Sequence, residues 1–77
     1  MNQDIEQAVA AVIKDADVEV VVEGNRATIT VVSPIFSELS RVQKQQKVYG
    51  CIDEFIKDGR LHAVTIRALT PEEVQDS

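Results

Sequence analysis

Very few side chains in this 77-residue chain could do chemistry, because it has one histidine, His62, and one cysteine, Cys51. A neutral imidazole can bind a metal ion or move a proton near neutral pH. A thiol becomes a nucleophile or a metal ligand once it is ionised. The two residues fall in different predicted elements, and the sequence has no Ser/His/Asp set, no phosphate-cradling glycine loop and no Cys/His cluster with zinc spacing. An enzyme is therefore the least supported class of protein.

Three basic residues, Arg41, Lys44 and Lys47, are spaced by three and spread over a sector of roughly 120° on a predicted helix. Such a surface can meet phosphate groups or an acidic partner, although charge runs of this kind are more often a solvated helix face. The net charge of −5 and the pI near 4.6 argue against general attraction to nucleic acid. The stretch from 33 to 67 nevertheless has six basic and four acidic residues, so one surface can be locally positive.

The elements that position these residues follow from hydrophobic periodicity. Apolar residues at three- and four-residue steps predict a helix over 3–14, with its apolar side formed by Ile5, Ala8, Val9, Val12 and Ile13. Alternation of apolar and polar residues predicts a strand over 17–23 and a second over 27–31. Gly24 and Asn25 between them are typical of a tight hairpin turn.

The second half of the chain contains the predicted long helix. Pro34 ends the second strand, and a short turn follows. Ser40 and Gln43 have capping-box spacing, so a helix is expected from there to about residue 58, with Gly59 stopping it. Its predicted apolar side consists of Val48, Tyr49, Ile52, Phe55 and Ile56.

A third strand is predicted over 61–69, with His62, Val64 and Ile66 on one face. A lone histidine in that position is more often a packed residue than a ligand. Thr70 and Pro71 then predict a last short helix. The order αββ(α)αβα gives an α+β fold in which helices cover a three-stranded mixed sheet, because the long helix can join parallel strands.

The length suits a single domain spanning 1–77. No apolar run reaches the roughly 20 residues that a membrane helix needs, and the N-terminal residues lack the basic start of a secretory signal. One unpaired cysteine fits a reducing compartment. We therefore expect a cytoplasmic protein that does not bind membranes.

Three stretches of the chain resemble the BolA-like family, in order and spacing. They are Ser40-Arg41-Val42-Gln43-Lys44-Gln45-Gln46-Lys47-Val48-Tyr49-Gly50, Leu61-His62-Ala63-Val64 and Leu69-Thr70-Pro71-Glu72-Glu73. The Lys-Gln-Gln and Tyr-Gly pairs of the long helix resemble the acid-stress branch of that family. The resemblance implies a fold similar to the class II KH domain, which agrees with the element order predicted above.

The resemblance also implies a function. Family members are not known as enzymes, and they pair with monothiol glutaredoxins, where a 2Fe-2S cluster shared with glutathione bridges the two proteins. The protein is then expected to hold no cofactor by itself. A DNA-binding transcriptional regulator of the stress response is the alternative, and a homodimer is left open. RNA clamping through a Gly-x-x-Gly loop is not supported, because none of the three glycines are three residues apart.

By position, the resemblance assigns His62 as the iron ligand, and an imidazole in place of a thiolate raises the potential of such a centre. The second ligand is expected in the loop between the first two strands, yet residues 23–27 contain neither cysteine nor histidine. Glu23 or Asn25 could offer oxygen, which suits a soft iron–sulfur centre less well. Cys51 lies inside the long helix, away from the hairpin, and is predicted to be a structural cysteine despite Lys47 one turn earlier.

Overall fold

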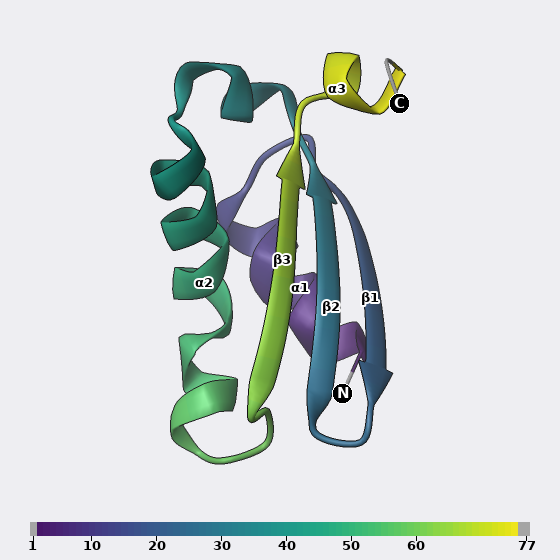
Figure 1. Ribbon diagram of the computed structural model, residues 1–77, viewed down its shortest axis with the longest axis vertical. Coiled ribbons are helices and arrows are strands. Elements are labelled where there is room, and N and C mark those ends of the chain that lie inside the picture. Colours follow the sequence, from purple (N-terminus) through teal and green to yellow (C-terminus); the bar gives the residue numbers. More distant parts are fainter. Residues whose placement is uncertain (1, 76–77) are drawn as a thin grey trace.

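A three-stranded mixed sheet with β2 at its centre organises the computed structural model, which describes residues 2–75 (Figure 1). β1 (Asp17–Glu23) and β2 (Arg26–Val32) are antiparallel and joined by a two-residue turn. Gly24 occupies that turn with a φ of 60°, a left-handed conformation in which a side chain would be strained. β3 (Ala63–Leu69) runs parallel to β2, which requires the long crossover between them.

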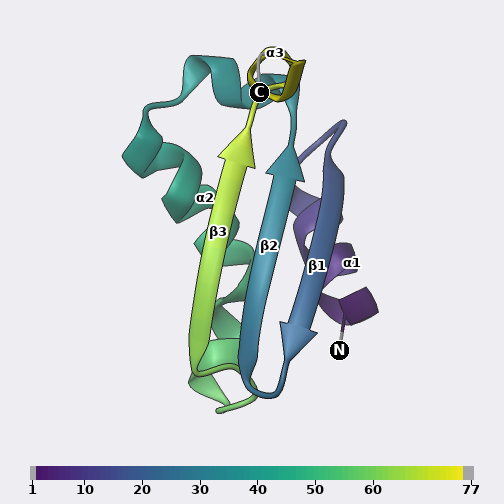
Figure 2. The ribbon, with the colours of Figure 1, turned by 45° about the vertical axis from the view of Figure 1, so that its right-hand side comes forward.

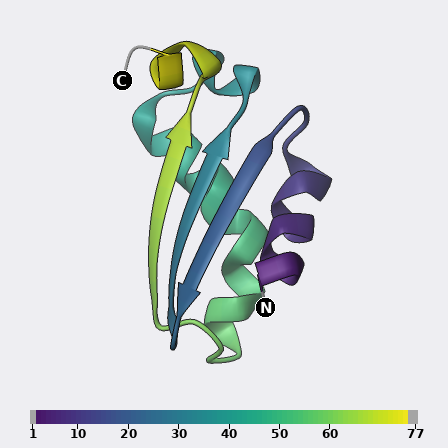
Figure 3. The ribbon, with the colours of Figure 1, turned by 90° about the vertical axis from the view of Figure 1, so that its right-hand side faces the viewer.

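Both long helices lie on one face of the sheet and leave the other face open, as Figure 3 shows. α1 (Asn2–Val12) packs against β1, while α2 (Arg41–Lys57) packs against β3 and α1. A 3₁₀ turn, η1 (Pro34–Glu38), precedes α2, and α3 (Pro71–Gln75) follows β3 at the same end of the sheet (Figure 2). The predicted order αββ(α)αβα and the mixed sheet are therefore confirmed.

The hydrophobic core lies between the sheet and the two helices. Its fully buried side chains come from every layer of the fold: Ile5, Val9, Ile13, Ile29, Val31, Phe36, Val48, Ile52 and Leu61. The buried side chains that the strands contribute follow from period-two alternation, because every second residue points to the core and the residues between them, threonines and charged residues among them, point to the open face.

Two residues predicted for the apolar sides of the helices are exposed instead. Val12 is 54% exposed, because α1 ends there and Ile13 takes the buried position before the chain turns at Asp15, whose φ is 55°. Tyr49 is 44% exposed, because it lies about 100° around the helix from Val48 and outside the buried stripe of α2.

The boundaries of α2 follow from local hydrogen bonds. The Ser40 hydroxyl accepts from the Gln43 amide at 3.2 Å, and the Gln43 side chain accepts from the Ser40 amide at 2.9 Å, which confirms the predicted capping box. At the other end Asp58 is the C-cap, and Gly59 adopts a φ of 84°. None of the helices in the described part of the chain is long and apolar enough to cross a bilayer.

Each edge strand of the sheet receives a side-chain amide from a helix. Asn2 of α1 donates from Nδ2 to the carbonyl oxygen of Val20 at 3.3 Å. Gln45 of α2 donates from Nε2 to the carbonyl oxygen of Ile66 at 2.9 Å. Each bond satisfies an edge carbonyl that no neighbouring strand of the sheet pairs with.

Candidate functional site

His62 lies immediately before β3 and is exposed. Its backbone amide and that of Ala63 both donate to the carbonyl oxygen of Asn25, at 2.8 and 3.4 Å. These two bonds attach the start of β3 to the turn between β1 and β2. The structure thus brings the single histidine beside the hairpin turn, although the two are far apart in the sequence.

The prediction that the third strand begins at residue 61 is wrong. Leu61 is 1% exposed and its amide donates to the carbonyl oxygen of Phe55 at 3.0 Å, so this residue closes the loop onto the end of α2. Strand pairing begins only at Ala63. For this reason His62 does not share the half-buried face of Val64 and Ile66, and the interpretation of His62 as a packed residue is also wrong.

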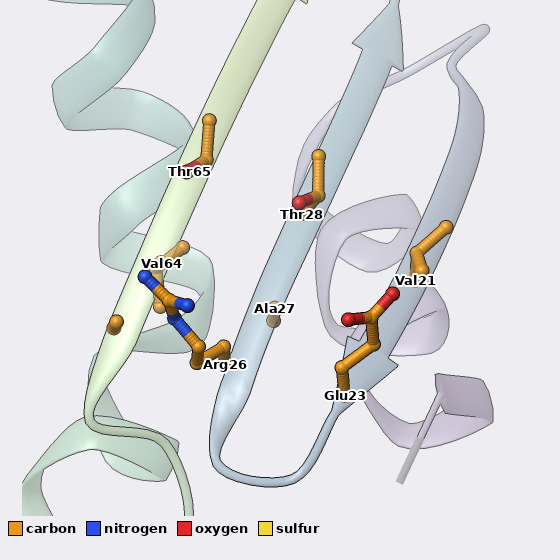
Figure 4. Close-up of a pocket in the computed structure, with 8 residues that line it drawn as sticks. Val21, Glu23, Arg26, Ala27, Thr28, Val64 and Thr65 are labelled. Carbon is orange, nitrogen blue, oxygen red and sulfur yellow. The ribbon is translucent and has the colours of Figure 1, made fainter.

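A shallow depression of about 270 Å³ lies on the open face of the sheet, over the end of β1 and the starts of β2 and β3 (Figure 4). Glu23 of β1 and Arg26 of β2 are its charged residues, and Ala63 of β3 borders it. In Figure 4 the Arg26 side chain extends towards β3, while the Glu23 carboxylate stays over β1, and the two form no ion pair. A carboxylate is a hard oxygen ligand that suits a soft iron–sulfur centre poorly, and a guanidinium group is a cation with no acceptor atom, so these two residues suit polar contacts better than ligation of iron.

The donor set around His62 is small. Within residues 2–75, no group of three or more His, Cys, Asp or Glu side chains is arranged to hold a metal ion. The turn residues Gly24 and Asn25 carry neither an imidazole nor a thiol. An iron–sulfur cluster at this end of the sheet would accordingly find one suitable ligand, His62, in this chain, and its other ligands would have to come from another molecule.

Cys51 is held inside α2 rather than near His62. Its thiol donates to the carbonyl oxygen of Lys47 at 3.3 Å, and the half-buried side chain packs against the core. Burial raises the pKa of the Cys51 thiol, against the smaller opposing effect of the Lys47 charge. A neutral, packed thiol is a poor nucleophile and a poor ligand, which agrees with the structural role predicted for it.

The predicted basic surface divides into two parts. Arg41 and Lys44 line a depression of about 390 Å³ between α2 and the end of β3, together with Arg67. Lys47 does not border this depression. Lys44 is also not a free cation, because its Nζ lies 3.1 Å from Oε1 of Glu73 and its side chain is 17% exposed.

Glu73 links α3 to α2 at this depression. Its Oε1 accepts from the backbone amide of Thr70 at 3.0 Å, while its own amide donates to the Thr70 hydroxyl at 3.2 Å. This reciprocal pair confirms that Thr70 begins the last helix. The Thr70 amide and, next, the Lys44 ammonium hold the pKa of the Glu73 carboxyl below its usual value.

Arg67 is the residue of this cluster that sequence reasoning missed. Strand alternation places it on the open face of the sheet, but its distance from Arg41 depends on how α2 lies along β3. The signal available in the sequence was that Arg67 belongs to the one basic stretch of an acidic chain.

Residues 4–73 match the family model described as BolA-like protein. The chain is 39% identical over 72 residues to the acid stress protein IbaG of Escherichia coli, covering 94% of this chain and 86% of that protein. Its fold is similar to BolA1 of Arabidopsis thaliana, with a TM-score of 0.82, 19% identity, and coverage of 94% of this chain and 93% of that one. The BolA domain of SufE1 from the same plant is also similar, with a TM-score of 0.82, 24% identity and the same coverage.

Proposed function

Since this chain belongs to the BolA-like family, as the match over residues 4–73 and the IbaG relative show, we propose that it is a non-enzymatic adapter in iron–sulfur handling. In this proposal a monothiol glutaredoxin is its partner, and a 2Fe-2S cluster shared with that partner and glutathione is its cargo. The acid-stress name of its relative favours a role in the stress response. The observation that carries the proposal is the exposed position of His62 beside the hairpin turn.

His62 meets the physical requirements for a shared ligand. It is anchored through its backbone, since its amide bonds to Asn25, and this leaves the exposed imidazole free to face another protein. Replacing a thiolate by a neutral imidazole raises the reduction potential of an iron–sulfur centre. The chain supplies one ligand, so the cluster forms at an interface and not within the isolated protein.

The proposed docking face consists of α2, β3 and α3. α2 and β3 lie side by side, and α3 follows β3 at one end of the sheet (Figure 1). This face includes the exposed Tyr49 ring, a residue type enriched at protein interfaces. The hairpin turn contains neither histidine nor cysteine. We therefore expect this chain to bind the shared cluster more weakly than a chain that supplies one ligand from the loop and one from the strand.

The test is a titration of cluster-loaded monothiol glutaredoxin with the purified protein, followed by visible circular dichroism. We expect a new spectrum that saturates at one-to-one with the native chain, no such spectrum with His62→Ala, and the native result with the control Cys51→Ala. Far-ultraviolet dichroism of His62→Ala should be unchanged, because the side chain is exposed. An identical cluster spectrum with His62→Ala would refute the ligand assignment.

A second variant tests the missing ligand directly. Asn25→His places an imidazole in the turn without disturbing the bonds to His62 and Ala63, since these bonds use the Asn25 backbone carbonyl. We expect this variant to retain the shared cluster longer than the native chain during dilution. Equal retention would show that ligand number at the turn does not limit the complex.

DNA binding is the second candidate, and the basic residues of α2 favour it. The structure weakens this alternative in two ways, because Lys44 is paired with Glu73 and Lys47 lies apart from Arg41. Salt-sensitive, sequence-selective binding that is lost when Arg41, Lys44 and Lys47 are neutralised would favour it over the adapter.

A further inference from the structure

The depression between α2 and the end of β3 brings together three cations from two elements. Arg41 and Lys44 come from the first turns of α2, and Arg67 comes from β3. One carboxylate, Glu73, also lines it, so the depression has a formal charge of +2 in a protein whose net charge is −5. This concentration of positive charge is unexplained by the proposed role of His62.

The two guanidinium groups are available to a ligand. Arg41 and Arg67 are exposed, and neither forms an ion pair with any carboxylate of residues 2–75. The acidic side chain on the same sheet row as Arg67 is Glu19, which is separated from it by Thr30 of β2. Lys44 is fixed at the edge of the depression by its bond to Glu73. The positive groups are thus partly positioned before a ligand arrives.

The edge of β3 adds a backbone donor. The carbonyl oxygen of Leu69 faces β2, where it accepts from the Ser33 amide, whereas the carbonyl oxygen of Ile66 faces outwards and accepts from Gln45. Because backbone groups alternate in direction along a strand, the amide of Ala68 points outwards like Ile66. Ala68 lines the depression, so its N–H lies on the same side as the three cations.

We propose that this depression is a binding site for a phosphate monoester dianion. The formal charge of +2 matches a group that carries about −1.5 to −2 near neutral pH. Guanidinium groups form two-point contacts with carboxylates and phosphates alike, but a phosphate monoester has three terminal oxygens and so can contact both guanidinium groups and the ammonium group more fully than the two oxygens of a carboxylate can. The volume of about 390 Å³ leaves room for the group attached to the phosphate.

The site lies on the proposed docking face of α2, β3 and α3, but away from His62. Arg67 lies five residues beyond His62, which corresponds to roughly 16 Å along an extended strand at about 3.3 Å per residue. Phosphate binding is measured on the chain without a glutaredoxin, and cluster sharing is measured through His62, so the failure of one proposal is distinguishable from the failure of the other.

The experiment is a titration of the full chain with sodium phosphate at pH 7.5, with ionic strength held constant by sodium chloride, followed by amide chemical shifts. We expect shifts confined to residues of the depression, including Ala68, with a dissociation constant of roughly 1–10 mM, as befits exposed charges. Sodium acetate under the same conditions should give clearly smaller shifts. Equal responses to phosphate, acetate and chloride would overturn the proposal.

Charge variants distinguish a specific phosphate site from general electrostatic attraction of anions to α2. Arg41→Gln and Arg67→Gln should each weaken phosphate binding roughly tenfold, the effect of one hydrogen bond to a charged group. Lys47→Gln removes the same charge from α2 outside the depression and should change binding less than twofold. Glu73→Gln should strengthen binding several-fold, because it frees the Lys44 ammonium. Equal weakening by Lys47→Gln and Arg41→Gln, or unchanged binding with Glu73→Gln, would overturn the assignment.

A last arm distinguishes the source of the phosphate. A short single-stranded oligonucleotide with a 5′-phosphate is compared with the same oligonucleotide ending in a 5′-hydroxyl. Tighter binding of the phosphorylated form than of inorganic phosphate identifies a nucleic-acid end as the source, and equal or weaker binding identifies a small phosphorylated molecule. Both results support the site, whereas equal binding of the two oligonucleotides at the depression would overturn recognition of a monoester.

Discussion

Replacing Ser40 by alanine tests whether the capping box determines the stability of α2. The change removes the hydroxyl that accepts from the Gln43 amide at 3.2 Å, but it leaves the bond from the Ser40 amide to the Gln43 side chain. Loss of such a cap costs about 1 kcal/mol of the free energy of unfolding. The cost should not be larger here, because Ser40 is exposed and water can reach the freed amide.

The size of the expected shift in Tm follows from the length of the chain. With an unfolding entropy of about 2.1 cal/mol/K per residue, a chain of 77 residues loses about 6 °C in Tm for 1 kcal/mol. Thermal and urea unfolding of Ser40→Ala, followed by far-ultraviolet dichroism, measure this shift.

Two further variants control the interpretation. Ser40→Asp should restore Tm, because aspartate caps helices as well as serine does. Ser37→Ala makes the same chemical change at an exposed serine of η1 and should shift Tm by less than about 3 °C. A Tm for Ser40→Ala within about 1 °C of the native value would refute the reasoning, as would failure of Ser40→Asp to rescue it.

Two predictions concern titratable groups. Because burial raises the pKa of Cys51, its alkylation by iodoacetamide should reach half-maximal rate at a higher pH in the native chain than in the chain unfolded by urea; an equal or lower midpoint in the native chain would contradict this. The lowered pKa of Glu73 means that its bonds to Thr70 and Lys44 contribute stability above the carboxyl's unfolded pKa, and this stability is lost as the pH falls through the folded pKa. The carboxyl carbon chemical shift of Glu73 should therefore titrate at lower pH in the native chain than in a peptide of residues 70–75. The substitution Lys44→Gln should move the midpoint of the Glu73 titration back towards the value in the peptide.

The sequence predicted the parts of the fold that depend on neighbouring residues. The capping boxes at Ser40 and Thr70 join residues three apart, so their spacing is visible in the sequence. The same is true of alternation in the strands and of the Val48–Ile52–Phe55 stripe of α2. These patterns are sufficient for the element order and for the α+β class.

The errors arose where distant segments meet. The start of β3 is displaced to Ala63 because Leu61 is buried with its amide bonded to the carbonyl oxygen of Phe55, and pairing with β2 begins only opposite Arg26; periodicity reveals neither contact. Membership of the cationic cluster depends in the same way on how α2 lies along β3, which excludes Lys47 and includes Arg67. The pairing of Lys44 with Glu73 likewise required the position of α3.

The two side-chain amides at the edges of the sheet also bear on how the molecule behaves at high concentration. An edge strand is a template for pairing with a second chain, and here Asn2 and Gln45 each occupy the carbonyl at the middle of one edge. Any strand that adds from outside must first displace one of these amides. Asn2 stands at the very beginning of α1, where helices fray most readily. The β1 edge is therefore the one from which we expect aggregation to start, and mild heating that loosens the first turn of α1 should promote it before the molecule unfolds.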